Sequence, residues 1–143
     1  MTEQTNIQIA RAFFNAWNAH DLSQFDPYEA EDMTVEAPGA PGPMTKAQNR
    51  MYNQGFLTAF PDGHFDVTLS VAQGDYVVLH WSASGTHTGP MATPSGGTVP
   101  PTGRAARVTG SSTFEIKNGK VTRSWTFWDM TALLGQLGLM PAM

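Results

Sequence analysis

The sequence predicts a single α+β domain in which helices come first and an antiparallel sheet follows. Apolar residues recur at helical spacing near the N-terminus, strict alternation takes over after Gly63, and an Asn-Gly pair joins the last two alternating segments. At 143 residues, the chain is long enough for one domain with a hydrophobic core. We find no internal repeat and no linker, so residues 1–143 are expected to form one domain.

The N-terminal segment is expected to be helical. Apolar residues recur every three or four positions from Ile7 to Trp17, so an amphipathic helix should cover about residues 5–19. Asp21 is a favoured capping residue and is expected to open a short helical turn. The Asp26-Pro27 pair should end that turn, because the residue before a proline avoids the helical conformation.

A short strand and a second helix should follow. Residues 32–36 are interpreted as a strand, closed by the Pro/Gly-rich loop 37–43. Thr45 and Gln48 have the spacing of a capping box, in which each side chain accepts a hydrogen bond from the other residue's backbone amide. The helix that they open should run to about Phe60.

Period-two alternation predicts four strands, over about residues 64–72, 75–89, 106–116 and 121–129. The last two meet through Asn118-Gly119, a pair typical of tight hairpin turns because both residues tolerate positive φ. The four strands are therefore expected to form an antiparallel meander.

Two segments fall outside this alternation. Residues 90–103 are rich in proline and glycine and are expected to form a long loop at one end of the sheet. Long loops in compact domains tend to act as lids or binding loops. Residues 130–138 are the last segment, and Asp129 is placed to cap them as a helix.

The composition excludes several classes of protein. The net charge is −4 and no run of Lys or Arg occurs, so a nucleic-acid footprint or an anionic-membrane patch is not expected. No apolar stretch approaches the roughly 20 residues that span a bilayer, and the N-terminus has no secretory signal pattern. Cysteine is absent, which excludes disulfides and thiolate chemistry. A cytoplasmic location is consistent with these features.

The sequence shows no pattern for a metal or a cofactor. The four histidines, His20, His64, His80 and His87, form no His-Glu-x-x-His pair, and His80 and His87 should point to opposite faces of one strand. The chain also has no Gly-x-Ser-x-Gly elbow, no phosphate-binding Gly-rich loop and no dinucleotide fingerprint. We therefore expect no metal and no cofactor.

Asp129 is the main candidate for acid/base chemistry. Alternation puts it on one face of the last strand with Arg123, Trp125 and Phe127. Burial beside two aromatic rings would raise the pKa of a carboxyl group, as proton exchange with carbon near neutral pH requires. Asp129 could instead only cap the next helix, and a close Arg123 would lower its pKa and weaken this hypothesis.

Secondary candidates surround that position. His87 lies near the end of its strand and shares the parity of Trp81, so it is a second catalytic candidate or a hydrogen-bonded strand-end histidine. Glu36 could project inward from the early strand, although a solvated glutamate is the commoner case. The candidate substrate-binding residues are Trp125, Phe127, Trp81, Glu36, Phe56 and Trp17.

Several motifs, in order along the chain, resemble the SnoaL-like polyketide cyclase family. They cover nearly the whole sequence: Ala59-Phe-Pro-Asp62, Gln73-Gly-Asp75, Gly85-Thr-His-Thr-Gly89, Pro100-Pro-Thr-Gly-Arg104, Asn118-Gly-Lys-Val121, Trp125 four residues before Asp129, and Leu133-Leu-Gly-Gln-Leu-Gly138.

The resemblance implies a cone-shaped α+β barrel of the ketosteroid isomerase and nuclear transport factor 2-like superfamily, in which a bent antiparallel sheet wraps around N-terminal helices. It also implies cofactor-free aldol cyclisation of a polyketide ester, with Asp129 taking the acidic α-proton. By the same resemblance, His87 and Trp125 lie around the pocket and the protein forms a dimer through the outer sheet face.

Two positions depart from the family pattern. Many relatives carry a histidine near the end of the early strand, where this chain has Glu36. The segment from Met91 to Val99 is longer than the usual connection before Pro-Pro-Thr-Gly. The first difference alters the charge of the pocket, and the second alters access to it.

The leading hypothesis is a cofactor-independent enzyme that acts on a small apolar carbonyl compound, with Asp129 as general acid/base. The alternatives are a related lyase, isomerase, hydrolase or oxygenase on the same fold, or a non-catalytic binding and dimerisation module. A catalytic Asp129 should be buried at the base of a cavity. An exposed Asp129 that caps the last helix would mean that the acid/base claim fails.

Overall fold

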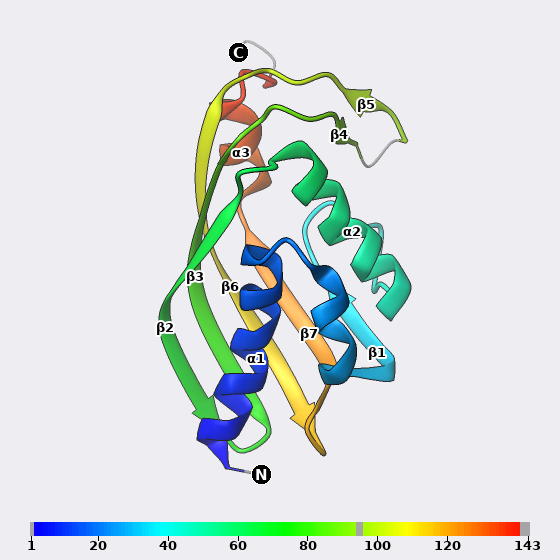
Figure 1. Cartoon of the computed structure of the whole chain (residues 1–143), viewed down its shortest axis with the longest axis vertical. Coiled ribbons are helices and arrows are strands. Elements are labelled where there is room, and N and C mark those ends of the chain that lie inside the picture. Colours follow the sequence, from blue (N-terminus) through cyan, green and yellow to red (C-terminus); the bar gives the residue numbers. More distant parts are fainter. Residues whose placement is uncertain (1, 94–95, 141–143) are drawn as a thin grey trace.

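The chain folds into three helices and a 3-10 helix packed on one face of a bent sheet (Figure 1). The computed structural model describes residues 2–93 and 96–140. The element order is α1 Glu3–Asn18, η1 Leu22–Tyr28, β1 Glu29–Glu36, α2 Lys46–Ala59, β2 His64–Gln73, β3 Tyr76–Thr86, β4 Met91–Ala92, β5 Thr98–Val99, β6 Ala105–Lys117, β7 Lys120–Trp128 and α3 Met130–Gln136.

The predicted capping box and the predicted hairpin turn are confirmed. Thr45 accepts a hydrogen bond from the backbone N–H of Gln48 at 3.2 Å, and the Gln48 side chain accepts from the Thr45 backbone at 2.9 Å, so α2 begins with a capping box. Asn118 and Gly119 have φ values of 55° and 79°, the pair of positive angles that a tight hairpin between β6 and β7 requires. Asp21 caps η1 by accepting from Ser23 N. The prediction that Asp26-Pro27 ends this turn is wrong, because Pro27 lies inside η1, which runs to Tyr28.

The sheet is mixed rather than wholly antiparallel, and it is open. Its strand order is β1-β7-β6-β3-β2, and β1 pairs with β7 in parallel while the other neighbours are antiparallel. The prediction of a single α+β domain with a bent sheet is confirmed, whereas full closure into a barrel is not observed. The parallel pairing was not visible in the sequence because β1 and β7 are the most distant strands along the chain.

The loop predicted over residues 90–103 contains a small antiparallel pair, with Met91 opposite Val99. Residues 94–95 of that loop, like residues 1 and 141–143 of the predicted domain, lie outside the described residues. The pair stands at the end of the molecule beside α2 (Figure 1).

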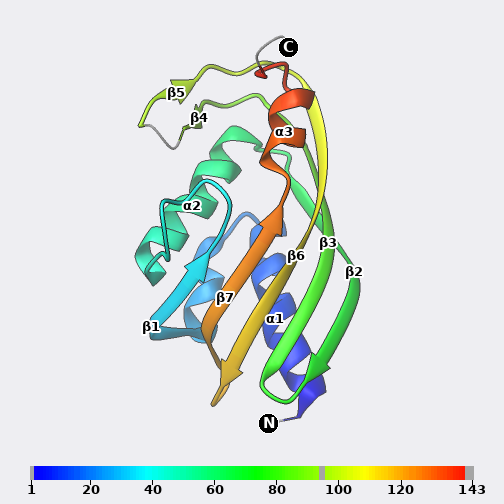
Figure 2. The same cartoon turned by 180° about the vertical axis from the view of Figure 1, so that it is seen from behind.

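The core forms where α1 packs against the inner face of the sheet. Ile9 and Ala10 of α1 are buried against Val77 and Leu79 of β3 and Phe114 of β6. Figure 2 shows the opposite face of the sheet, where no helix of the described chain crosses strands β7, β6, β3 and β2. The sheet therefore has one face covered by helices, the inner face, and one outer face that is open.

Candidate functional site

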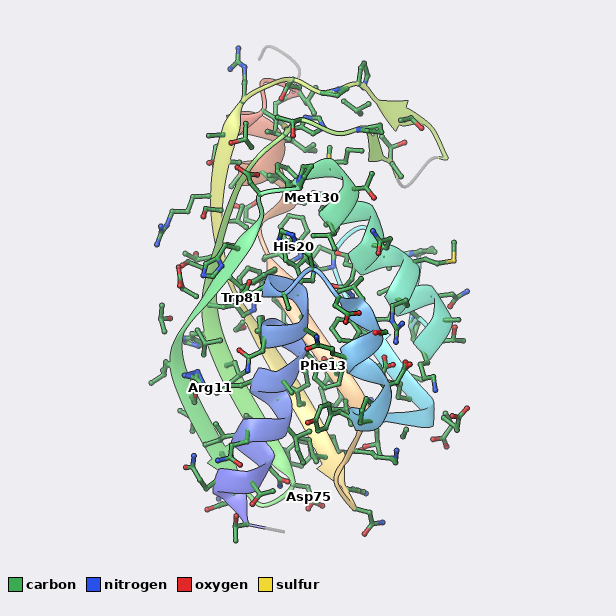
Figure 3. The ribbon with its side chains drawn as sticks, viewed as in Figure 1. Arg11, Phe13, His20, Asp75, Trp81 and Met130 are labelled. Atoms are coloured by element: carbon green, nitrogen blue, oxygen red, sulfur yellow. The ribbon has the colours of Figure 1, made fainter. Side chains whose placement is uncertain are left out.

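A cavity lies between the helices and the inner face of the sheet. Its volume is about 180 Å³. Phe13 from α1 and Trp81 from β3 lie in the layer between helix and sheet (Figure 3). A cavity lined mainly by apolar side chains, with a few polar groups among them, is typical of a small-molecule site.

Aromatic side chains form most of the cavity wall. Phe14, Phe65 and Trp81 contact one another with ring centroids 5.0–6.3 Å apart, and Phe56 meets Trp128 edge to face at 5.6 Å. Three of the predicted substrate-binding residues, Trp17, Phe56 and Trp81, are among the lining residues. The aromatic lining consists of Phe13, Phe14, Trp17, Phe25, Tyr52, Phe56, Phe60, Phe65, Trp81, Phe114 and Trp128.

The polar groups on the wall are uncharged amides and hydroxyls, apart from the His64 imidazole. Among the described residues, none that lines the cavity is Asp, Glu, Lys or Arg. His64 lies at the exposed start of β2, where its Nε2 is 3.3 Å from an oxygen of Asp66. The polar lining side chains are Asn49, Tyr52, Asn53, His64, Ser84, Ser112, Ser124 and Thr126.

Helix α2 supplies an ordered group of polar side chains. Asn53 Nδ2 donates to both the backbone oxygen and the side-chain oxygen of Asn49, at 2.8 and 3.1 Å. The Tyr52 hydroxyl donates to the carbonyl oxygen of Pro38 at 2.7 Å and so ties the loop after β1 to α2. Burial raises the pKa of Tyr52 to about 12, against an opposite effect of a hydrogen bond with Trp128. The phenol therefore stays protonated and serves as a donor.

Three side chains of the sheet form a hydrogen-bonded chain on the inner face. Trp81 Nε1 donates to Ser112 Oγ at 3.1 Å, and Ser112 Oγ is 2.9 Å from Thr126 Oγ1. Ser112 of β6 and Thr126 of β7 are partners in register, which explains why their hydroxyls meet. All three residues line the cavity.

The predicted inner face of β7 is wrong. Ser124, Thr126 and Trp128 line the cavity, whereas Trp125 and Phe127 have the opposite parity and lie on the outer face of the sheet. Phe127 is 65% exposed, and the guanidinium of Arg123 lies 4.6 Å from the ring of Trp125. Large aromatic side chains suggested an inward face, but the hydroxyl residues Ser124 and Thr126 face inward, and Thr126 pairs with the Ser112 hydroxyl of β6.

The predicted burial of Asp129 is also wrong. Asp129 is exposed, and its Oδ1 accepts a hydrogen bond from the backbone N–H of Ala132 at 3.0 Å, as an N-cap of α3. It is absent from the described lining residues, although Trp128 before it and Leu133 after it both belong to them. The carboxylate thus follows directly after a wall residue and starts a helix that closes the same cavity.

His87 lies outside the described lining of the cavity and is fully buried. Its Nδ1 accepts from the backbone N–H of Thr102 at 3.2 Å and is 3.0 Å from the Thr102 hydroxyl, while its ring packs on Phe60. Nδ1 as an acceptor assigns the ring proton to Nε2, which has no hydrogen-bond partner in the described chain. Burial lowers the pKa of His87, against an opposite effect of the Gly89 carbonyl. This geometry corresponds to the alternative of a structural strand-end histidine.

Glu36 is exposed at the end of β1 and is not one of the described lining residues. Met33 and Val35 of the same strand line the cavity instead, because they have the inward parity. The predicted projection of Glu36 into the pocket is therefore wrong, and the expected change in pocket charge does not arise from it.

Sequence reasoning missed several lining residues. Tyr52, Asn49 and Asn53 lie on one side of α2, and their spacing of three and four residues was a signal for a common helix face. Alternation in β7 put Trp128 and Asp129 on opposite faces, and the structure agrees. The sequence did not indicate that the face with Trp128 is the inner one. Ser112 gave no signal in the sequence, because its role depends on a partner in another strand.

Residues 2–93 and 96–140 contain no group of three or more His, Cys, Asp or Glu side chains that could hold a metal ion. None of the helices in these ranges has the length and apolar content needed to cross a membrane.

Comparison with known proteins assigns the chain to a family. The model of the SnoaL-like polyketide cyclases matches residues 7–137. No curated protein matches the chain. Among solved structures, AclR of Streptomyces galilaeus, provisionally assigned as a hydroxylase, is 25% identical with a TM-score of 0.85, covering 99% of this chain and 90% of that one.

IdmH of Streptomyces antibioticus, provisionally assigned as a polyketide cyclase, is 27% identical with a TM-score of 0.79, over 93% of this chain and 98% of that one. A SnoaL-like protein from Jannaschia sp. CCS1 has the same fold, with 19% identity, a TM-score of 0.84 and coverage of 97% and 95%. The family model spans nearly all of the helices and strands that build the cavity, and the chain belongs to the SnoaL-like polyketide cyclase family.

Proposed function

We propose that this protein is a cofactor-independent cyclase that acts on a small, apolar, polyketide-like carbonyl compound. The observation that carries the proposal is the aromatic-walled cavity in a member of a cyclase family. In the proposed reaction, a base removes a proton from a carbon next to a carbonyl, and the resulting enolate carbon attacks a second carbonyl of the same molecule. One carbon–carbon bond forms and the alkoxide takes up a proton, so the reaction is redox-neutral.

The cavity wall suits such a substrate. Flat aromatic side chains offer stacking surfaces for a folded polyketide, and the amides and hydroxyls can position its carbonyl groups. A wall without Asp, Glu, Lys or Arg side chains favours a neutral ligand, since burying an unpaired charge is costly. Exclusion of water would also protect the reactive enolate.

Asp129 is exposed and caps α3, so the claim of a base buried at the floor of the cavity fails. We propose instead that it accepts the proton at the rim of the cavity. Its position between the wall residues Trp128 and Leu133 supports this role, as does the family resemblance. The cap hydrogen bond engages Oδ1, and Oδ2 takes part in no hydrogen bond with another described residue. The substrate itself would then cover the carboxylate and displace water from it.

His87 is proposed as a positioning residue rather than a catalytic one. Through its Nδ1 and its backbone, it holds the segment from Thr102 to Arg104 against the end of β3. That segment leads directly into β6, which carries Ala106 and Val108 of the cavity wall. His87 therefore fixes the position of the residues just before β6, and with them which β6 side chains face the cavity.

The test compares two aspartates that both cap helices. Asp129→Asn and Asp21→Asn each keep a good capping side chain and remove a carboxylate, and Asp21 caps η1. With aryl β-keto esters that carry a second ketone placed for closure of a six-membered ring as probes in deuterated water, we expect the wild-type protein and Asp21→Asn to catalyse α-proton exchange and ring closure. Asp129→Asn should lose this activity by about 100-fold or more, with probe binding retained. Full activity of Asp129→Asn would remove Asp129 from the mechanism.

A second candidate is an oxygenation in the same cavity, in which dioxygen would supply one oxygen atom and an external two-electron donor would reduce the other to water. It is favoured by the similarity to AclR, which is provisionally assigned as a hydroxylase. Mass spectrometry of the product separates the two reactions. Aldol closure leaves the mass of the substrate unchanged or lowers it by one water, whereas hydroxylation adds one oxygen atom.

We also propose that the protein is a homodimer through the outer face of the sheet. Leu69 and Val71 of β2 and Phe127 of β7 are exposed there, at 50%, 52% and 65%. Strand register puts Leu69 in one row with Phe127, and Val71 in the next row with Trp125. Strands β3 and β6 lie between these side chains, with His80 and Ser111 in the first row and Val78 and Thr113 in the second. An exposed apolar face of this kind is typical of protein–protein contact surfaces.

A further inference from the structure

We propose that the hydroxyl of Thr126 is the hydrogen-bond donor for a carbonyl oxygen of the bound ligand, and that Trp81 and Ser112 orient it. The proposal deepens the proposed function, on which it rests for the class of ligand. It concerns binding at a defined position in the cavity, so it can be tested without turnover.

The chain of hydrogen bonds has a defined start. The indole N–H of Trp81 can only donate, so Ser112 Oγ, 3.1 Å away, must accept. Ser112 is only 3% exposed, and a buried hydroxyl proton without a partner is costly. Apart from Trp81, the only side-chain hydrogen-bond partner of Ser112 Oγ among the described residues is Thr126 Oγ1, at 2.9 Å. The Ser112 hydroxyl therefore donates its proton to Thr126 Oγ1.

Thr126 is the last member of this series of hydrogen bonds, and its hydroxyl proton is left without an acceptor. Its hydroxyl makes no other hydrogen bond among the described residues, and the side chain is half-buried on the cavity wall. Because Thr126 Oγ1 already accepts from Ser112, its remaining capacity is chiefly that of a donor. The partner that fits it is an acceptor oxygen on a molecule in the cavity.

The surroundings of Thr126 strengthen this donor. A hydroxyl that accepts a hydrogen bond becomes a better donor, so the Trp81–Ser112 contact polarises Thr126. Apolar and aromatic side chains dominate the wall, where a hydrogen bond competes less with water. An enolate oxygen carries more negative charge than a ketone oxygen and would bind more strongly still.

The test uses 9-fluorenone and fluorene, which share a flat three-ring skeleton and differ at the carbonyl. Binding is followed by quenching of tryptophan fluorescence, to which the lining residues Trp17, Trp81 and Trp128 contribute. Thr126→Val removes the hydroxyl at nearly constant volume, Thr126→Ser retains it, and Thr113→Val alters a threonine on the outer face of β6. Thr113 is the matched control, because its register partner Trp125 also faces outward.

We expect Thr126→Val to weaken fluorenone binding by about three- to tenfold, as for the loss of one net hydrogen bond, and fluorene binding by less than about twofold. Thr126→Ser and Thr113→Val should bind both probes like the wild type. Ser112→Ala should weaken fluorenone binding less than Thr126→Val does. An unchanged ratio of the two dissociation constants in Thr126→Val, or a wild-type protein that does not bind fluorenone, overturns the proposal.

The infrared carbonyl stretch of bound fluorenone gives a direct readout that does not depend on the stability of a variant. In the wild type, we expect a lower stretching frequency than in a hydrocarbon solvent, and a return toward the solvent value in Thr126→Val. A wild-type frequency equal to that in hydrocarbon overturns the proposal. Failure of the β-keto ester assay with Asp129 would leave both readouts intact, so the two proposals fail separately.

Discussion

Trp81 of β3 lies across Gly110, its register partner in β6, so closely that no side chain fits at position 110. A Cβ atom there would stand 2.5 Å from Cζ2 of Trp81 and 2.6 Å from the carbonyl oxygen of Phe127. The glycine thus lets the indole cross β6 and reach Ser112, two residues further along the same strand.

We therefore expect Gly110→Ala to lower the free energy of unfolding by about 1–3 kcal/mol, the usual cost of overpacking. Denaturant unfolding measures this change. The matched control is Gly55→Ala within α2, where an added Cβ meets no atom within 4 Å and alanine is the better helix former. Equal stability of Gly110→Ala and wild type would show that the Trp81 ring and the β7 backbone can both move aside.

Acid should destabilise the protein through His87. Burial holds the pKa of His87 below its ordinary value of 6.5, so the unfolded chain binds the proton more readily than the folded one. The stability that His87 contributes is thus present above pH 6.5 and is lost as the pH falls below that value. His87→Gln should lack this part of the slope when melting temperature is measured from pH 7.5 to 5. An identical slope in wild type and variant would contradict the burial argument.

Local sequence signals predicted most of the fold. The capping box at Thr45, the Asn118-Gly119 turn and the alternation of the long strands depend on neighbouring residues only, and all three appear in the structure. The parallel pairing of β1 with β7 depends on contacts between residues far apart in the sequence, such as Glu36 and Trp125. No periodicity within either strand encodes that contact.

The site was harder to predict because alternation gives two faces but not their direction. In β7, the more apolar face carries Trp125 and Phe127, and yet the cavity side carries Ser124, Thr126 and Trp128. The hydroxyls can be buried since they bond across strands, as Thr126 does with Ser112. A single sequence does not reveal such a partner, and the same ambiguity led to the wrong expectation for Asp129.

The outer sheet face gives a prediction about assembly. If two copies pack through Val71 and Phe127, the double variant Val71→Glu/Phe127→Glu should convert a dimer into a monomer, because it would bury two unpaired carboxylates in each subunit. Light scattering after gel filtration measures the mass. Met51→Glu on α2 is the control, since Met51 is 74% exposed and belongs to a different surface. A wild-type protein that is monomeric, or a double variant that stays dimeric, would refute this interface.

The cap role and the chemical role of Asp129 can be separated by three substitutions. Asn and Ser are good N-caps, so Asp129→Asn and Asp129→Ser should unfold close to the wild-type temperature, whereas Asp129→Ala should lose about 0.5–2 kcal/mol. Proton exchange with the β-keto ester probes requires the carboxylate itself, so all three variants should lose it together. Activity that instead follows stability, lost in the alanine variant and kept in the other two, would mean that Asp129 serves the protein only as the start of α3.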